Sequence, residues 1–263
     1  MKKIFSYLHG FFKYRELFFQ LVARDIKLKY RRSILGYLWS VLNPLLIMIV
    51  MILVFSNMFR QNIQFFPVYL LIGQMLFNFM TTATSRSLTS VIDNASLLKK
   101  IYIPKYIFTL AVVTSELVNF FFMMGALIIV VIATGVPVTW RMFFILIPII
   151  QIYFFCIGLG LFLAQVTVFF RDIMYIWSVI TTAWLYLSAI FYPVSILPGK
   201  IYFLVTQINP LYFYITMFRN FTFGGPNLGS LDLAIRGAFA AGLMLILGLV
   251  SFSHNQKKFI LYL

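Results

Sequence analysis

Charged residues are scarce in this sequence, and acidic residues are the scarcest. Only 10% of the 263 residues are charged, with 21 Lys and Arg against 6 Asp and Glu, whereas soluble domains carry about 25% charged residues. The apolar share is 62% and the mean hydropathy is +0.98. Because so few charges cannot cover the surface of a soluble domain, the composition excludes that class and indicates an integral membrane protein.

Cysteine and histidine are also rare, which limits the chemistry that the chain can perform. Cys156 is the only cysteine, so neither an intramolecular disulfide nor a cysteine metal site can form. His9 and His254 lie at opposite ends of the sequence, and we therefore expect no metal site. The acidic residues are scattered rather than clustered, which argues against an enzyme that uses acid and base catalysis.

Long uncharged apolar windows are what the sequence has instead. A helix needs about 20 apolar residues to cross about 30 Å of hydrocarbon. We therefore predict an all-α integral membrane protein, with a six-span transmembrane domain over residues 35–252. The predicted spans are residues 36–59, 66–84, 107–133, 143–165, 173–192 and 234–252.

The cations predict the orientation of these spans. If the N-terminus is cytoplasmic, 16 of the Lys and Arg residues fall on the cytoplasmic side and five on the outer side. Cytoplasmic loops are enriched in Lys and Arg, so the split favours this orientation over the reverse. With an even number of spans, both termini are expected in the cytoplasm, and residues 253–263 form a cytoplasmic tail.

Two segments do not fit a plain six-span bundle. Residues 1–34 are too charged to span and too apolar for a solvated tail, so we predict a basic amphipathic helix in the inner interface. In residues 193–233, apolar runs too short to cross alternate with Pro and Gly. We predict short re-entrant helices there on the outer side, packed against protein or lining a wet cavity.

Five motifs occur in order along nearly the whole chain. They are Arg24 to Trp39 with Asn43-Pro44, residues 66–73, residues 94–104, Phe170-Arg171-Asp172-Ile173, and Ile208-Asn209-Pro210-Leu211 followed by Arg219. Together they resemble ABC transporter permeases of the type-2 class, in the branch that exports O-antigen, capsular polysaccharide or teichoic acid. The resemblance implies a permease of the bacterial inner membrane that moves a polysaccharide linked to an undecaprenyl-type lipid.

The resemblance also implies the partners of the chain. It predicts a homodimer that carries two copies of a cytoplasmic ABC ATPase subunit, which binds the ATP and Mg, so that this chain holds no cofactor. The residues agree, because the sequence contains no phosphate loop of the form G-x-x-x-x-G-K-[S/T]. Its one Gly-Lys pair, Gly199-Lys200, is followed by Ile. We therefore expect a permease without enzyme activity of its own.

Residues 86–105 are interpreted as a coupling loop, whose short helix docks on the ATPase. The alternative is a basic loop held at the anionic inner leaflet. In the turn between the fourth and fifth spans, a local ion pair is the structural alternative to an ATPase contact. The residues expected to face the ATPase are Asp93, Asn94, Ser96, Leu97, Leu98, Lys99, Lys100, Tyr102, Arg171 and Asp172.

The N-terminal amphipathic helix supplies candidates for contact with the phosphates of a lipid carrier and for gating. Arg and Lys side chains bind phosphate oxygens directly. Asp25 also has a structural interpretation, as an i to i+4 partner of Lys29. The candidates are Arg24, Asp25, Lys27, Lys29, Arg31 and Arg32.

Glu116 is the only acidic residue inside a predicted span. An acid at this depth is a functional candidate, either as a proton site or as the partner of a buried cation. The alternative is a structural hydrogen bond to Thr114 or Asn119 on a neighbouring helix. The sequence leaves these interpretations open.

Aromatic rings provide candidates for the translocation path, because sugar faces stack on them without needing charge. The abundance of aromatic residues also fits membrane-interface belts and lipid contacts. The path candidates are Tyr37, Trp39, Phe77, Trp177, Trp184 and Tyr186.

Two other functions remain as alternatives. An ion-gradient-driven flippase or secondary carrier of a lipid-linked glycan would want several ionisable residues in the membrane and often internal repeats. A membrane-embedded glycolipid enzyme would want clustered catalytic groups. A requirement for ATP or for a proton gradient separates the transport classes, and the sequence does not determine which glycan is carried.

Overall fold

The computed structural model describes residues 12–31, 33–59, 63, 65–100, 103–224, 229–256, 259 and 262. Within these residues the chain is all helical and has no strand, which confirms the predicted fold class. The α-helices are α2 (Arg15–Tyr30), α3 (Trp39–Phe59), α4 (Phe66–Thr89), α5 (Ala95–Lys100), α6 (Tyr106–Thr134), α7 (Leu146–Phe169), α8 (Ile173–Tyr186), α9 (Gly199–Phe203), α10 (Pro210–Phe223) and α11 (Gly229–Asn255). Short 3-10 or π segments are η1 (Gly36–Leu38), η2 (Trp140–Ile145), η3 (Val194–Ile196) and η4 (Leu204–Ile208).

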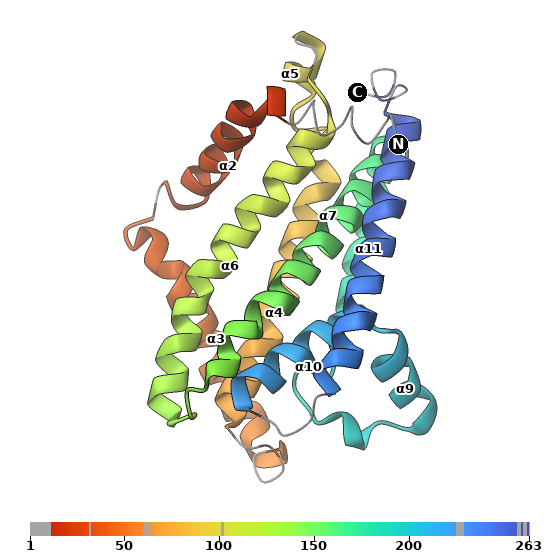
Figure 1. Cartoon of the computed structure of the whole chain (residues 1–263). Helices are drawn as coiled ribbons and strands as arrows, with labels where there is room; N and C mark the ends of the chain where they lie inside the picture. The colour runs from red at the N-terminus through yellow and green to blue at the C-terminus, as the bar shows by residue number, and fades with distance from the viewer. Residues whose placement is uncertain are drawn as a thin grey trace.

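The long helices form an elongated bundle (Figure 1). Within the described residues, five helices are long and apolar enough to cross a membrane, or six if a bent pair counts as one span. That pair, Gly199–Ile208 and Pro210–Phe223, bends by 77°. Helix α5 and the C-terminal end of α11 lie at one end of the bundle, called the α5 end, and α9 and α10 lie at the other, called the α9 end (Figure 1).

Helix α4 is the centre of the bundle. It packs against α3, α6, α7, α8 and α10, and 72% of its most apolar window is buried. For α3 and α11 the buried share is only 17%, although both are strongly apolar. Apolar side chains on the outside of a bundle suit hydrocarbon rather than water, which agrees with an integral membrane protein.

Glycines let α7 and α11 approach each other closely. A Cβ atom on Gly158 would lie 2.3 Å from the Met244 carbonyl oxygen, and one on Gly248 would lie 2.1 Å from the Gly158 carbonyl oxygen. Small residues at such crossings allow backbones to touch, which is how membrane helices gain packing energy where lipid offers no hydrophobic drive. The close contact between α7 and α11 therefore depends on Gly158 and Gly248 having no side chain.

The predicted span 173–192 is helical only as far as Tyr186. The chain then continues without regular helix over residues 187–192, with Ala189 at φ 48°. A non-helical backbone within a membrane must satisfy its carbonyl groups with other protein groups. Among the described residues, the side chains of Tyr69, Asn209 and Arg219 bond to residues 187–192, and we call these three side chains the carbonyl clamp.

Arg219 is the cation of the carbonyl clamp. Its Nη1 donates to the Ala189 carbonyl at 3.2 Å, and its Nη2 donates to the Ile190 carbonyl at 3.2 Å and to the Tyr69 carbonyl at 3.0 Å. Its guanidinium stacks 3.3 Å from the centre of the Tyr69 ring. Arg219 is one of the five cations assigned to the outer side by the sequence interpretation, but it is not an exposed loop cation, because the residue is only 6% exposed.

Asn209 completes the carbonyl clamp at the bend between η4 and α10. Its amide nitrogen donates to the Leu187 carbonyl at 2.9 Å and to the Ser188 hydroxyl at 3.1 Å. Its oxygen accepts from the Leu211 backbone, which caps α10, and from the Trp184 indole at 2.7 Å. The Tyr69 hydroxyl adds bonds to the carbonyls of Ala189 and Tyr192. The end of α8 is therefore held by side chains from α4 and α10.

Candidate functional site

Helix α2 lies along α6 at the α5 end of the bundle (Figure 1). Helix α4 extends to Thr89, so Arg86 lies on its last turns. The sequence interpretation began the coupling loop at residue 86, and the structure corrects this start. Because Arg86 lies on the helix, its side chain projects in a defined direction and reaches both α2 and α6.

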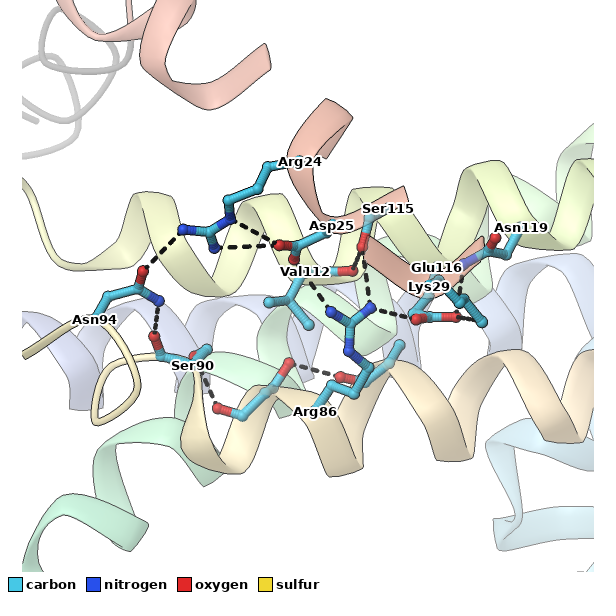
Figure 2. Close-up of polar contacts among 12 residues, drawn as sticks. Arg24, Asp25, Lys29, Arg86, Ser90, Asn94, Val112, Ser115, Glu116 and Asn119 are labelled. Atoms are coloured by element: carbon cyan, nitrogen blue, oxygen red, sulfur yellow. Dashed lines mark hydrogen bonds and ion pairs between the residues drawn. The ribbon is translucent and has the colours of Figure 1, made fainter. Parts of the chain in front are cut away.

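Five ionisable side chains from α2, α4 and α6 meet at this end (Figure 2). We call them the charge cluster: Arg24, Asp25, Lys29, Arg86 and Glu116. Asp25 pairs with Arg24 at 3.1 Å and with Arg86 at 3.2 Å. Glu116 pairs with Lys29 at 3.1 Å and also with Arg86. Arg86 therefore joins the two carboxylates, one from α2 and one from α6.

The surroundings of Glu116 decide between the interpretations left open by the sequence. Besides its two cations, Glu116 accepts a hydrogen bond from the Asn119 side chain at 3.1 Å. Asn119 stands one turn further along the same helix, not on a neighbouring helix as expected. The expected alternative, Thr114, instead contacts Tyr153 at 2.9 Å. Glu116 is thus the partner of two cations, which the sequence interpretation had placed in the interfacial helix and in the coupling loop.

The charge cluster is continuous with the start of α5. Arg24 Nη1 donates to the Asn94 side-chain oxygen at 3.4 Å, and Asn94 donates to the Ser90 carbonyl at 2.8 Å. The Ser90 hydroxyl contacts the Thr109 hydroxyl on α6 at 2.9 Å. Because Asn94 immediately precedes α5, its hydrogen bond with Arg24 connects the start of this helix to the ion pairs (Figure 2).

The carboxylates and the cations of the cluster differ in exposure. The side chains of Asp25 and Glu116 are 6% and 3% exposed, whereas those of the three cations are 40 to 48% exposed. A buried carboxylate without a partner is strongly destabilising, so these two acids require their cations. The cations reach solvent with part of their length, as long basic side chains do at a membrane boundary.

Two cavities adjoin the cluster and share Lys29, Thr82 and Glu116. One, of about 580 Å³, lies among α3, α4 and α6, and the other, of about 550 Å³, lies between α2 and α4. The larger cavity is rich in hydroxyl and amide side chains, contributed by Ser33, Ser40, Asn43, Asn78 and Asn119. Its apolar walls include Trp39 and Phe120. Such a lining suits a ligand that has both an anionic group and many hydroxyl groups.

The residues expected to face the ATPase divide into two sets. Asp93, Ser96, Lys99 and Lys100 are exposed around α5, whereas Leu98 is buried in the core of this chain. Leu97 is half-buried and packs against the same core, and Asn94 bonds to Arg24. Tyr102 lies outside the described residues.

The turn between α7 and α8 does not contain the expected local ion pair. Arg171 and Asp172 are both exposed and form no ion pair with each other in the described structure. The tight turn is closed by backbone hydrogen bonds instead, such as that from Ile173 to the Phe170 carbonyl at 3.3 Å. Both side chains are thus accessible to a partner at the α5 end.

The candidates on α2 also divide. Lys27 and Arg31 are exposed, while Arg32 lies outside the described residues. The expected pair of Asp25 with Lys29 is wrong, because Asp25 bonds to Arg24 and Arg86 and Lys29 bonds to Glu116. The i to i+4 spacing put Asp25 and Lys29 on one face of α2, and that face meets charged residues of α4 and α6.

The path candidates lie in different environments. Tyr37, Trp39 and Tyr186 are exposed, and Trp39 lines the larger cavity. Phe77 and Trp177 are buried within this chain, where the Trp177 indole donates to Thr84 at 3.2 Å. Trp184 is half-buried and bonds to Asn209.

Lys105 stands between the end of α5 and the start of α6, close to the C-terminal part of the chain. Its Nζ donates to the Gln256 carbonyl and lies 5.2 Å above the Phe259 ring. Burial lowers the pKa of Lys105 below its ordinary value. The segment after α11 is thereby attached next to α5.

Comparisons with known proteins point to one family. The chain matches the ABC-2 type transporter family over residues 16–223. It is 31% identical over 210 residues to the O-antigen export system permease protein RfbA of Myxococcus xanthus, which covers 79% of this chain and 80% of the relative. It is also similar to RfbA of Klebsiella pneumoniae, at 28% identity with 80% and 81% covered. A third relative is the capsule polysaccharide export inner-membrane protein CtrC of Neisseria meningitidis, at 26% identity with 83% of both chains covered.

Proposed function

We propose that this chain, which belongs to the ABC-2 type transporter family, is the permease subunit of an ATP-driven exporter of a lipid-linked polysaccharide. Relatives named for O-antigen and capsule export support this substrate class. The observation that carries the proposal is the charge cluster, which connects the α5 segment to membrane helices α4 and α6. A permease driven from outside needs such a connection between the point of energy input and the spans.

The energy enters, in this proposal, through α5. Two copies of a separate ABC ATPase subunit bind ATP and Mg, and each receives α5 with the exposed residues Asp93, Ser96, Lys99 and Lys100. Arg171 and Asp172 provide a second, smaller contact. Movement of α5 pulls on Asn94 and, through Arg24, on the ion pairs of α4 and α6.

The path for the glycan is proposed along α4 and α8. Polar side chains on an exposed membrane surface are costly against hydrocarbon, so they favour a wet path or a partner helix. On α8 the exposed residues Tyr175, Ser178, Thr182 and Tyr186 recur at helical spacing and share one face. Thr82 and Ser85 are exposed on the adjacent α4. A second copy of the chain facing this surface would enclose the path, which supports a homodimer.

The proposed setting is the bacterial cytoplasmic membrane, with the α5 end and both termini in the cytoplasm. The excess of cations on that side supports this orientation. There α2 meets the phosphates of the undecaprenyl-type carrier at the inner leaflet, and Lys29 is the α2 cation that lines both cavities. The glycan itself then moves along the uncharged surface of α4 and α8.

An ion-gradient mechanism has less support from this geometry. A proton carrier needs a carboxylate that can gain and lose a proton during transport. Glu116 is held by Lys29, Arg86 and Asn119 together, so no carboxylate in a spanning helix of the described structure is without a cation. The chain therefore resembles a driven permease more than a secondary carrier.

Deletion of the gene in its native host tests the proposal. We expect surface glycan to disappear and lipid-linked glycan to accumulate inside, with both restored by the wild-type gene. A tagged copy should co-purify with an ABC ATPase subunit, and export into inverted vesicles should require ATP but no proton gradient. Unchanged surface glycan together with no co-purifying ATPase would contradict the proposal.

A further inference from the structure

The charge cluster contains more positive than negative charge. Arg24, Lys29 and Arg86 contribute three cations, whereas Asp25 and Glu116 contribute two carboxylates. No other carboxylate of the described residues lies within ion-pairing distance of these cations. One positive charge is left over beside two cavities, and a partly buried surplus charge favours binding of an anion.

Lys29 is the cation that can change its partner. Arg86 bonds to both carboxylates, and Arg24 bonds to Asp25 and Asn94. Within the part of the chain that the structure describes, Lys29 makes one ion pair, to Glu116 at 3.1 Å. If the Lys29 side chain moves away, Glu116 still accepts hydrogen bonds from Arg86 and Asn119. A lysine ammonium on a flexible stem also reorients more easily than a guanidinium held by two bonds.

The cavity beside Lys29 is lined by groups that can bind a sugar attached to an anion. Within about 580 Å³ the lining combines Lys29 with the amides of Asn43 and Asn78 and the hydroxyls of Ser33 and Ser40. Sites for small ligands span about 300 to 1,000 Å³. Amides and hydroxyls bond to sugar hydroxyl groups, and Trp39 offers a ring on the same wall.

We propose that this cavity binds a sugar diphosphate ester, with Lys29 exchanging Glu116 for a phosphate oxygen and the amide side chains holding the first sugar. The proposal rests on the proposed function and identifies which part of the exported molecule is recognised. Binding also acts as a signal, because Lys29 no longer holds α2 to α6 while Arg86, Asp25, Arg24 and Asn94 still connect the site to α5. Occupancy is thus communicated to the ATPase.

A binding measurement with a short-chain prenyl diphosphate sugar tests the site. The permease–ATPase complex is placed in phosphatidylcholine nanodiscs, and wild type is compared with Lys29→Gln, Lys29→Arg and Arg15→Gln. Arg15 is exposed at the opposite end of α2 from Lys29, so Arg15→Gln removes the same charge from the same helix. We expect Lys29→Gln to weaken binding about tenfold, which corresponds to roughly 1.4 kcal/mol. Equal loss in Arg15→Gln would overturn the proposal.

Two further ligands distinguish the source of the phosphate. Inorganic pyrophosphate should compete weakly in wild type and not at all in Lys29→Gln, because it lacks the sugar contacts. Nanodiscs that contain phosphatidylglycerol should leave the affinity for the diphosphate sugar nearly unchanged. Competition by phosphatidylglycerol as strong as that by the diphosphate sugar would assign the cavity to lipid headgroups and contradict the proposal.

The variant Glu116→Gln separates exchange from a merely structural ion pair. Loss of the competing carboxylate should tighten binding of the diphosphate sugar several-fold, while damage to the fold would weaken it. If Glu116→Gln does not assemble, Lys29→Arg carries the test, because it keeps the charge and should keep binding within a few-fold of wild type. Weaker binding in an assembled Glu116→Gln complex would contradict the exchange.

ATP hydrolysis reports the signal and keeps the two proposals apart. We expect the diphosphate sugar to stimulate hydrolysis in wild type and in Arg15→Gln, and we expect Lys29→Gln to lose most of that stimulation. Stimulation that survives in Lys29→Gln would overturn the exchange while export remains intact. Absence of both hydrolysis and export in wild type would instead contradict the proposed function.

Discussion

Each end of the bundle has an arginine that bonds to several neighbouring groups, but the kinds of group differ. At the α5 end Arg86 bonds to carboxylates on two other helices, and its side chain is 40% exposed. At the α9 end Arg219 is 6% exposed and, among the described residues, bonds only to backbone carbonyls and the Tyr69 ring. Ion pairs near water can exchange partners, whereas a guanidinium locked into carbonyl groups cannot. The comparison indicates one end built to rearrange and one built to stay fixed.

Removing the fixed arginine should have the largest effect. Arg219→Leu leaves the carbonyls of Tyr69, Ala189 and Ile190 short of a partner, at about 3–5 kcal/mol in total. At about 2–4 °C per kcal/mol, the melting temperature of the detergent-purified protein should fall by roughly 10 °C. Lys200→Gln, an exposed cation at the same end, should change it little. Equal stability of the two variants would contradict the carbonyl clamp.

Removing the arginine of the charge cluster should cost less. Arg86→Gln leaves Asp25 with Arg24 and Glu116 with Lys29, so a loss of about 1–3 kcal/mol is expected after discounting for solvent exposure. The double variant Arg86→Gln with Glu116→Gln should recover part of that loss, because it removes the buried carboxylate that has lost one of its two cations. Thermal unfolding of wild type, Arg86→Gln, Glu116→Gln and the double variant measures the coupling energy between Arg86 and Glu116. Purely additive effects would show that this pair contributes nothing to stability.

Asn209→Ala tests the second member of the carbonyl clamp. It removes the cap of α10 and the donor to the Leu187 carbonyl, so we expect a loss of about 2 kcal/mol. Asn220→Ala, which lies within α10 and is half-buried beside a cavity, is the matched control. Hydrogen exchange of residues 187–192 should increase in Asn209→Ala alone. Unchanged protection of this segment would show that Asn209 does not hold it.

Asn94→Ala should have the smallest effect on stability and a clear effect on coupling. It breaks a 3.4 Å hydrogen bond, which is worth less than about 1 kcal/mol. Because Arg24 then loses its connection to α5, we expect hydrolysis to continue while export per ATP decreases. Gln20→Ala, which removes an exposed amide from α2, should leave that ratio unchanged. A normal ratio in Asn94→Ala would remove this link from the mechanism.

The sequence predicted the fold class from composition and the spans from uncharged windows, since both depend on local hydrophobicity alone. It also placed Arg24, Asp25 and Lys29 on one amphipathic helix. It could not pair Glu116 with Lys29 and Arg86, which stand 87 and 30 residues away. Such pairing depends on the rotation of each helix in the bundle. The one signal that pointed to it was a lone acid in an apolar span, which requires a cation nearby.

The sequence by itself determined that this chain is helical, membrane-embedded and basic, because each residue contributes its hydropathy and charge wherever it packs. The tertiary structure decided which charges meet. It moved Arg219 from the expected outer surface into the core, because the non-helical residues 187–192 need donors that only a neighbouring helix can supply. It also left Lys29 with one replaceable partner, because helix packing fixed Arg86 between both carboxylates.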